Sequence, residues 1–397
     1  MTYQLSVVLF LSIPEGQPLP ELLMLRQALA KIGVSYALHT ITDADAVKKL
    51  VAASGIGQLA GDYILWLPLG LCLEWSWLPA IWREREQAEV VVFSRFLPEA
   101  GNAQDDKNEK RHNAHLRRSL DLDVHDLTGG MLLCRRDVLQ NFAPERADAL
   151  LWTELLVHAH MQGYRIAELP FAATCHTPAR TLHYPDSFAQ IIPTLWCLWL
   201  LRNSIQCADY DARAFDSRIP FQRAWQRARY AAVMRFVPPR ARTLDIGCGS
   251  SRIFAALSEN SVGLDIQLNK LRFALRYGRA LTNGDTFRLP FAAQSFDCVL
   301  SSQVIEHLPA DESVFDEMVR VLRPEGRLII GTPDYHSLWP VIEQLYGFFA
   351  PNAYADEHIT HYHPALMQEK LSRLGFRLEA STYVFDAEWV GMFSRES

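Results

Sequence analysis

Strand-like and helix-like segments alternate along this chain in two series, and this alternation restricts the possible folds more than any other feature. The first series contains the apolar strands SVVLFLSI, SYALHTI, GDYILWLPL, AEVVVFSRF and RIAELPF, with helical segments between them. The second contains TLDIG, SVGLDI, TNGD, FDCVLSS and GRLIIGTP. Such alternation is typical of mostly parallel sheets with helices on their faces. We therefore expect an α/β protein with two doubly wound domains.

Length and composition agree with two globular domains. The 397 residues exceed the size of one ordinary domain, and with 49% hydrophobic residues either half can bury its own core. The net charge of −6 and the lack of a basic run argue against a nucleic-acid-binding protein. The seven cysteines are scattered and have no CxxC spacing, which indicates reduced cytoplasmic thiols rather than a disulfide framework or a zinc site.

Two apolar stretches bear on membranes. MTYQLSVVLFLSIPEG lacks a basic start and a small-residue cleavage site, so we expect a first core strand and not a signal peptide. SFAQIIPTLWCLWLL is uncharged between Asp186 and Arg202, but it is too short to span a bilayer and contains Pro193. With Trp196 and Trp199, it either lies at a membrane interface or packs as a helix between the two domains.

The domain limits follow from these patterns. We expect a first domain over residues 1–180, an amphipathic connector over 181–214 and a second domain over 215–397. Within the first domain, the charged run DDKNEKRHN is expected to form a solvated loop.

The segment LDIGCGSSRIF combines a strand, a glycine turn and the start of a helix. Gly247 and Gly249 allow the backbone to turn tightly and to approach a ligand, which would meet the free N–H groups of the helix. A dinucleotide fingerprint would have a third glycine where Arg252 stands. Asp245 would repel a pyrophosphate but suits a cationic amino-acid ligand. The turn therefore favours S-adenosylmethionine (SAM) over a dinucleotide.

Further acidic residues fit the same ligand. Asp265 ends the strand VGLDI, where its carboxylate can accept from two ribose hydroxyls, and Asp285 in NGDTFRLPF can accept from an adenine amino group. The fourth strand, FDCVLSSQVIEHL, runs into Glu306 and His307.

With these motifs in order, residues 215–397 resemble a class I SAM-dependent methyltransferase. The resemblance rests on LDIGCG, VGLD, GDTFRLPF, FDCVLSSQVIEHL and RVLRPEGRLII, and it departs from many members at Ser251, where they have glycine. It implies a Rossmann-like fold with SAM as the cofactor. The cofactor-binding residues that it implies are Asp245, Gly247, Cys248, Gly249, Asp265, Ile266, Asp285, Thr286 and Gln303.

Methyl transfer needs mainly the positioning of two reactants, and a general base only when the acceptor is a hydroxyl. The candidate catalytic residues are Glu306, His307, His358 and His361, with His363 nearby. Each of these has an alternative, structural interpretation.

The same histidines raise the question of a metal ion. Relatives that methylate quinol-type hydroxyls have a Glu-x-x-Glu-His metal motif, and here Gln303 replaces its first carboxylate. His358 and His361, at i and i+3, can share one face of a helical turn in the insertion that usually forms the acceptor pocket, but no third zinc ligand is evident. We expect no metal ion.

The first half resembles a family 2 glycosyltransferase of the polyprenyl-phosphate type, through VVVFSRF, DLTGGMLLCRRDVL and ELLVHAHMQGYRIAELPF. The resemblance implies a glycosyltransferase-A-like domain. In that family the strand at 61–69 ends in an Asp-x-Asp metal motif, whereas this chain has Leu67–Pro68–Leu69, which cannot bind a hard cation. The nucleotide-binding turn keeps only Asp43 and Asp45, and about fifteen residues separate Asp45 from Gly61, too few for the family's next strand. We expect a truncated domain without glycosyl transfer.

The resemblance also places residues of a glycosyl-acceptor site. These are Asp126, Gly129, Gly130 and Glu154, together with Arg180 near a lipid phosphate. A helix or turn cap is the alternative for Asp126, and a solvated or paired helix residue is the alternative for Glu154.

Together these patterns predict a SAM-dependent methyltransferase that transfers to oxygen and whose small-molecule acceptor is lipid-linked or glycosylated. The glycosyltransferase-like half would serve as an inactive module in a cytoplasmic enzyme, with residues 187–202 as a peripheral membrane contact. Two alternatives remain open: a bifunctional glycosyltransferase and methyltransferase, and a non-catalytic membrane-associated scaffold.

Overall fold

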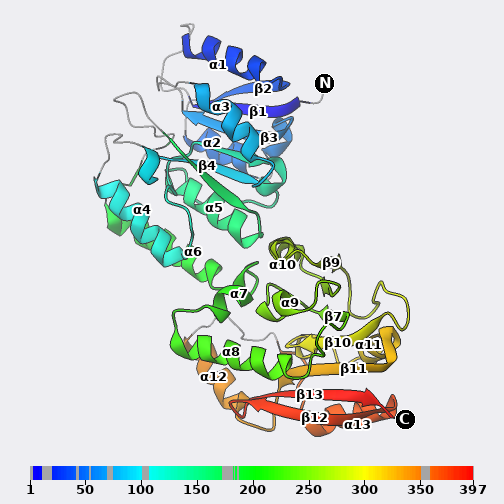
Figure 1. The fold of residues 1–397 in the computed structure, drawn as a ribbon. Coiled ribbons are helices and arrows are strands. Elements are labelled where there is room, and N and C mark those ends of the chain that lie inside the picture. The colour runs from blue at the N-terminus through cyan, green and yellow to red at the C-terminus, as the bar shows by residue number, and fades with distance from the viewer. Residues whose placement is uncertain are drawn as a thin grey trace. The chain divides into compact units, whose positions relative to one another are not determined.

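The chain divides into two compact units, Met1–Arg202 and Asn203–Ser397, and each is described by itself (Figure 1). The structure is a computed structural model. It describes residues 3–10, 20–41, 44–52, 55–68, 75–100, 107–171, 182, 184–185, 187–349 and 358–396.

A six-stranded sheet forms the centre of the first unit, in the order β2-β1-β3-β5-β4-β6. Its strands are β1 (Tyr3–Phe10), β2 (Tyr36–Ile41), β3 (Gly61–Pro68), β4 (Val90–Ser94), β5 (Leu132–Arg135) and β6 (Ile166–Pro170). All neighbouring pairs are parallel except those of β5, which is antiparallel to β3 and β4. The predicted, mostly parallel sheet is therefore confirmed.

Strand β3 shows why its sequence is a continuous apolar run. Ile64 and Trp66 lie in one hydrophobic core, and Leu65 and Leu67 lie in the other. Successive side chains point to opposite faces of a sheet, so both faces of this strand are covered. The segment 69–74 lies outside the described residues.

Six α-helices of the first unit are described: α1 (Pro20–Lys31), α2 (Ala44–Val51), α3 (Leu78–Glu84), α4 (Lys107–Leu120), α5 (Leu150–Met161) and α6 (Phe188–Arg202). In α1, Leu25 and Leu29 are buried and Leu23 is exposed, so the helix packs one apolar face against the core.

Helix α4 corrects the prediction of a solvated loop at DDKNEKRHN, since the run continues from Lys107 as a helix. Glu109 and Asn113, one turn apart, are buried and bonded to Arg95 and Thr128. The other charged side chains cover the exposed face. A charge-rich segment can thus form a helix when one of its faces is buried, and the number of charges alone did not reveal that face.

The second unit contains a seven-stranded sheet in the order β12-β13-β11-β10-β7-β8-β9. Its strands are β7 (Thr243–Ile246), β8 (Val262–Asp265), β9 (Ala280–Asn283), β10 (Phe296–Ser302), β11 (Leu322–Pro333), β12 (Phe376–Val384) and β13 (Glu388–Arg395). Only β13 is antiparallel to its neighbours. This arrangement confirms the predicted Rossmann-like α/β fold.

The strands β12 and β13 were not predicted. They form a hairpin whose turn residues Phe385 and Asp386 both have a φ of 51°. Hairpin turns with positive φ usually contain Asn-Gly or Asp-Gly, because glycine and asparagine tolerate positive φ. Phe385–Asp386 lacks this sequence signal, so the hairpin could not be predicted from it.

The helices of the second unit are α7 (Tyr210–Phe215), α8 (Pro220–Met234), α9 (Arg252–Ala256), α10 (Leu268–Ala274), α11 (Ser313–Val321), α12 (Trp339–Phe349) and α13 (Pro364–Arg373). Strand β7 lies between β8 and β10, where the strand order reverses direction. Ligands of such sheets bind in the crevice at this point, outside the carboxyl ends of the strands.

Residues 181–214, predicted as one connector, are divided between the two units. In α6, Ile191 and Leu198 belong to the core of the first unit, and buried Arg202 donates from Nε to the carbonyl of Leu120 at 3.1 Å. Helix α7 belongs to the second unit. Within the described residues no helix has the length and apolar character needed to cross a bilayer.

Candidate active site

The glycine turn after β7 forms the floor of the site. Gly247 has a φ of 67° and Gly249 a φ of 51°, a region that residues with a Cβ atom rarely adopt. A Cβ atom at Gly247 would also lie 2.3 Å from Cγ2 of Val304. Ser251, where many relatives have glycine, caps α9 by accepting from the N–H of Ile253 at 3.0 Å. The turn is thus compatible with this departure.

Buried carboxylates surround the turn. Asp265 Oδ2 accepts from the Gly249 N–H at 2.9 Å, and Oδ1 accepts from the Gln267 N–H at 2.8 Å. Burial raises the pKa of Asp245 well above its usual range, and the negative charges of Asp265 and Asp211 raise it further. A cation bound beside Asp245 would relieve this repulsion.

A cavity of about 650 Å³ opens beside the turn. Of the predicted cofactor residues, Asp245, Gly247, Cys248 and Gln303 line it. It is also lined by residues that the sequence analysis did not identify: Asp211, Phe215, Gln226, Arg229, Lys270 and Ser302.

Asp211 comes from α7, inside the predicted connector, and no motif marks it. Its Oδ2 accepts from the N–H of Ser250 at 3.3 Å and lies 3.5 Å from Nζ of Lys270. Lys270 and the Ser250 hydrogen bonds outweigh burial and lower the pKa of Asp211. Ser302, by contrast, is the last residue of β10, and side chains at the carboxyl ends of such strands often line ligand sites, so its position could have marked it.

The residues of this cavity fit SAM. Ser302 Oγ and Gln303 Nε2 are buried and have no hydrogen-bond partner in the part of the chain that the structure describes. The three cations lining the cavity are each paired with a carboxylate: Arg229 with Glu388, Arg252 with Asp216 and Lys270 with Asp211. A ligand with an ammonium group could pair with Asp245, and its polar acceptor atoms could accept hydrogen bonds from Ser302 and Gln303.

Five other predicted cofactor residues do not line this cavity: Gly249, Asp265, Ile266, Asp285 and Thr286. Asn283 Nδ2 donates to the carbonyls of Asp265 and Ile266, both at 3.0 Å, which ties the ends of β8 and β9 together. Asp285 is exposed, and its Oδ1 accepts from the Phe287 N–H at 3.0 Å. These residues lie along the carboxyl edge of the sheet, and their roles toward ribose and adenine stay predictions.

Beyond β10, the structure brings three predicted catalytic residues together. Glu306 and His307 lie in the 3₁₀ turn Ile305–His307. The carbonyl of Glu306 accepts from the N–H groups of Ile359 at 2.9 Å and Thr360 at 3.0 Å. The ring centroids of His307 and His358 are 4.8 Å apart.

The expected helical turn through His358 and His361 is wrong, because these residues lie in irregular structure. His361 stacks on Tyr335 with centroids 3.9 Å apart. His358 Nδ1 lies 2.7 Å from Glu343 Oε1 and 2.9 Å from the Tyr335 hydroxyl. Glu343 belongs to α12, in the aromatic-rich insertion, and the sequence analysis missed it.

His363 has a structural role. Its Nδ1 caps α13 by accepting from the Leu366 N–H at 3.3 Å, and its ring stacks on that of His336.

The electrostatics of the cluster differ from residue to residue. Glu306 is fully buried, and neither carboxylate oxygen has a hydrogen-bond partner among the described residues. Burial raises its pKa to about 8, with a contribution from the charge of Glu388. Burial and the neighbouring His307 lower the pKa of His358. At neutral pH the cluster therefore contains a protonated Glu306 and a neutral His358.

Glu306, His307 and His358 also have the spacing of a metal site, with one ligand atom from each lying within 4.8 Å of the others. The expectation that no metal binds stays a prediction.

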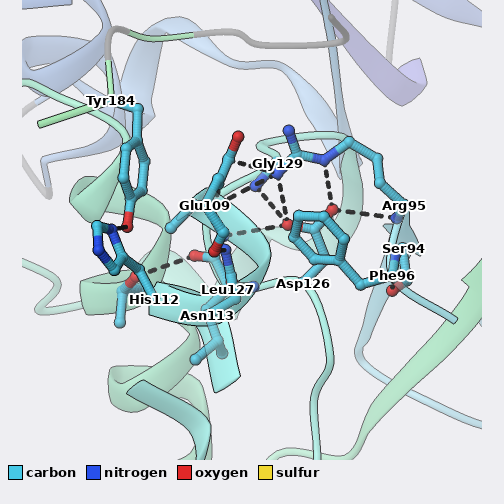
Figure 2. A network of polar contacts seen from close by, with 12 residues as sticks. Ser94, Arg95, Phe96, Glu109, His112, Asn113, Asp126, Leu127, Gly129 and Tyr184 are labelled. Atoms are coloured by element: carbon cyan, nitrogen blue, oxygen red, sulfur yellow. Dashed lines mark hydrogen bonds and ion pairs between the residues drawn. The ribbon is translucent and has the colours of Figure 1, made fainter. Parts of the chain in front are cut away.

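In the first unit, Asp126 lies in a buried network around Arg95 (Figure 2). Arg95 Nε donates to Asp126 Oδ2 at 2.7 Å, and its Nη2 donates to Asp126 Oδ1 at 2.8 Å and to Glu109 Oε1 at 2.9 Å. The N–H of Gly129 donates to Asp126 Oδ1 at 2.9 Å. Burial opposes ionisation, but Arg95 lowers the pKa of Asp126. Asp126 thus acts as a structural cap and ion-pair partner.

Gly130, with a φ of 70°, follows this turn. Glu154 Oε2 accepts from the N–H groups of Glu145 at 2.9 Å and Arg146 at 3.3 Å. Asp43, Leu69 and Arg180 lie outside the described residues.

Known proteins that resemble this chain match it in the second unit. A family model described as a methyltransferase domain matches residues 244–330. The chain is 33% identical over 148 residues to a demethylmenaquinone methyltransferase of Beutenbergia cavernae, covering 35% of this chain and 59% of that protein. It is 27% identical over 190 residues to a malonyl-[acyl-carrier protein] O-methyltransferase of Methylococcus capsulatus, covering 43% and 66%.

Among solved structures, the magnesium protoporphyrin IX methyltransferase of Synechocystis with bound S-adenosylhomocysteine aligns with a TM-score of 0.37 and 17% identity, covering 46% of this chain and 92% of that one. The chain spans less than two thirds of the length of the two curated relatives described above. The matched residues contain the glycine turn and the strand ends that line the cavity. The second unit of this chain is therefore a methyltransferase domain of the class that uses S-adenosylmethionine as its cofactor.

Proposed function

We propose that the protein transfers a methyl group from SAM to a hydroxyl oxygen of a small-molecule acceptor. The observation that carries this proposal is the pair formed by His358 and Glu343, whose Nδ1 and Oε1 atoms lie 2.7 Å apart. Transfer to a hydroxyl requires removal of its proton, and a neutral histidine held by a carboxylate is suited to that task.

The residues of the chain divide the work between binding and proton transfer. SAM supplies a methyl group on a positively charged sulfur, already activated for displacement. Asp245, Ser302 and Gln303 hold the cofactor in the cavity beside the glycine turn. His358 takes the proton of the acceptor, and Glu343 stabilises the imidazolium that results. Correct positioning supplies most of the rate.

This assignment predicts a specific loss in His358→Asn. General-base catalysis typically contributes between about 10² and 10⁴ in rate, so formation of S-adenosylhomocysteine should fall by at least a hundredfold. SAM affinity should not change, because His358 does not line the cofactor cavity. His336→Asn, which removes a histidine outside the cluster, is the matched control. Full activity in His358→Asn would remove the base from the proposal.

We further infer that the first unit performs no glycosyl transfer and serves as a docking module for a lipid-linked acceptor. Two observations support the lack of glycosyl transfer. Leu67 is buried core in the place where relatives keep a metal-binding carboxylate, and Asp126 is already neutralised by Arg95. Calorimetric titration with UDP- and GDP-sugars and manganese should show no heat of binding; clear binding would support the bifunctional alternative.

A peripheral membrane contact is part of the same proposal. Four large apolar side chains of α6 are exposed: Ile192, Trp196, Trp199 and Leu201. Trp196 is 59% exposed and stacks on Trp199 with centroids 5.4 Å apart. Helix α4 runs beside α6 (Figure 1) and exposes the cations Lys107, Lys110, Arg111 and Arg118. Apolar and cationic side chains on neighbouring helices favour anionic lipid surfaces.

Sedimentation with vesicles tests this contact. The full chain should bind vesicles that contain an anionic lipid, and the double change Trp196→Ser and Trp199→Ser should abolish binding. The matched control is Leu268→Ser with Leu275→Ser, two exposed leucines of the second unit. Equal binding of both double variants would contradict the membrane contact.

A further inference from the structure

A second cavity, of about 520 Å³, lies in the methyltransferase unit and is almost entirely apolar. Four aromatic side chains line it: Tyr210, Phe221, Trp225 and Trp339. We call this cavity the aromatic cleft.

The aromatic cleft adjoins both parts of the proposed active site. Gln226 and Arg229 line it as well as the cofactor cavity. Glu343, which lines the cleft, is the residue that bonds to His358. The cleft therefore shares two wall residues with the cofactor cavity and adjoins the proposed base through Glu343.

The walls of the cleft are fixed before a ligand arrives. Trp225 Nε1 donates to Glu388 Oε1 at 2.6 Å, and Arg229 Nε donates to Glu388 Oε2 at 2.8 Å. The ring of Trp225 packs near those of Phe221 and Trp339, with centroids 5.5 Å and 6.3 Å apart. A wall with few remaining rotamers binds a rigid ligand at low entropic cost.

The charged groups of the cleft do not select a charged ligand. Arg229 is paired with Glu388, and Glu343 is bonded to His358 and Tyr335. A phosphate or carboxylate in the cleft would have to displace one of these pairs. A sugar would leave most of its hydroxyls facing aromatic and aliphatic carbon, which carries a desolvation penalty.

We propose that the aromatic cleft binds the reacting end of the acceptor, and that this end is an uncharged aromatic ring with a hydroxyl group. Aromatic walls favour a flat ring through stacked and edge-on contacts. A phenolic hydroxyl, with a pKa near 10, gives up its proton to a histidine far more readily than an alcohol does. This inference rests on the proposed function and names its acceptor class, aromatic rather than glycosylated at the reacting end.

Calorimetric titration with 2-naphthol and with 2-naphthyl phosphate tests the inference on the full chain. In wild type, 2-naphthol should bind saturably, and the charged phosphate should bind at least about tenfold more weakly. Ile342→Phe, which fills the cleft, should weaken 2-naphthol binding at least tenfold. Val341→Phe on the same helix, at a 58% exposed position outside the cleft, should not.

The outcomes separate this inference from the function on which it rests. Equal 2-naphthol affinity in Ile342→Phe and Val341→Phe, or tighter binding of the phosphate, would overturn the aromatic cleft as the acceptor site. The same holds if SAM binds but 2-naphthol does not. A wild-type chain that fails to bind SAM would instead overturn the proposed function.

Discussion

Replacing Glu306 by glutamine should remove a large pH dependence from the stability of the protein. The side chain has no exposed surface, and burial raises its pKa from 4.5 to about 8. A carboxyl group with a raised pKa contributes its full stability below pH 4.5, and this contribution is lost as the pH rises through 8. At about 1.4 kcal/mol for each pKa unit, the loss amounts to about 5 kcal/mol.

Glutamine keeps the shape of the protonated acid but cannot ionise. We therefore expect the unfolding free energy of Glu306→Gln to match that of the wild type within about 1 kcal/mol at pH 5. Between pH 5 and pH 8.5 the difference should shift by about 4 kcal/mol in favour of the variant. Urea unfolding of the full chain, followed by circular dichroism at each pH, measures this difference. Comparison at equal pH cancels the titration of all other groups. Glu325→Gln, at an exposed position, is the matched control.

A stability difference that does not change between pH 5 and 8.5 would refute the reasoning, because Glu306 would then have the same charge in the folded and unfolded states. A divalent cation bound to Glu306, His307 and His358 would give a third result. The wild type would then be the more stable protein, and a chelator would remove its advantage.

The remaining predictions concern the glycine turn and the buried network of the first unit. Gly247→Ala should lower thermal stability and SAM affinity, because the new Cβ would collide with Val304. Gly278→Ala has the same φ of 67° but no atom within 4 Å of the new Cβ, so it should show only the backbone cost of about 1–2 kcal/mol. Equal losses in the two variants would show that the contact with Val304 is not the cause. Arg95→Met leaves two buried carboxylates unpaired and should destabilise the first unit by about 3–5 kcal/mol in calorimetry, without weakening SAM binding. Arg118→Met, at an exposed position of α4, is its control, and an equal effect would contradict the network.

The parts of the site that the sequence predicts are those whose chemistry is local. Gly247 and Gly249 are required by backbone conformations within one turn, and Asp265 lies at a strand end that the apolar pattern marks. Asp245 lies in β7, the strand that leads into the glycine turn. These features depend on residues that are neighbours in the chain.

The parts that escaped prediction depend on contacts between distant segments. Glu388 lies 159 positions from Arg229, and Glu343 lies 15 positions from His358. Asp211 meets Ser250 over 39 positions. No spacing rule relates such pairs, so only the folded structure brings them together.

The prediction of a solvated loop in place of helix α4 was wrong for a different reason. Its charge run indicated solvent, but the two inward-facing residues Glu109 and Asn113 are satisfied by partners on other elements. A buried polar residue is indistinguishable from an exposed one in the sequence until its partner is known.

The central claim is that the second unit binds SAM through the turn after β7, and calorimetric titration of the full chain with SAM tests it most directly. We predict saturable binding in the micromolar range that is lost in Asp265→Ala, whose carboxylate holds the Gly249 N–H. Asp297→Ala, an exposed carboxylate outside the cavity, should bind as the wild type does. A wild-type chain that is folded by circular dichroism and binds no SAM would contradict the account.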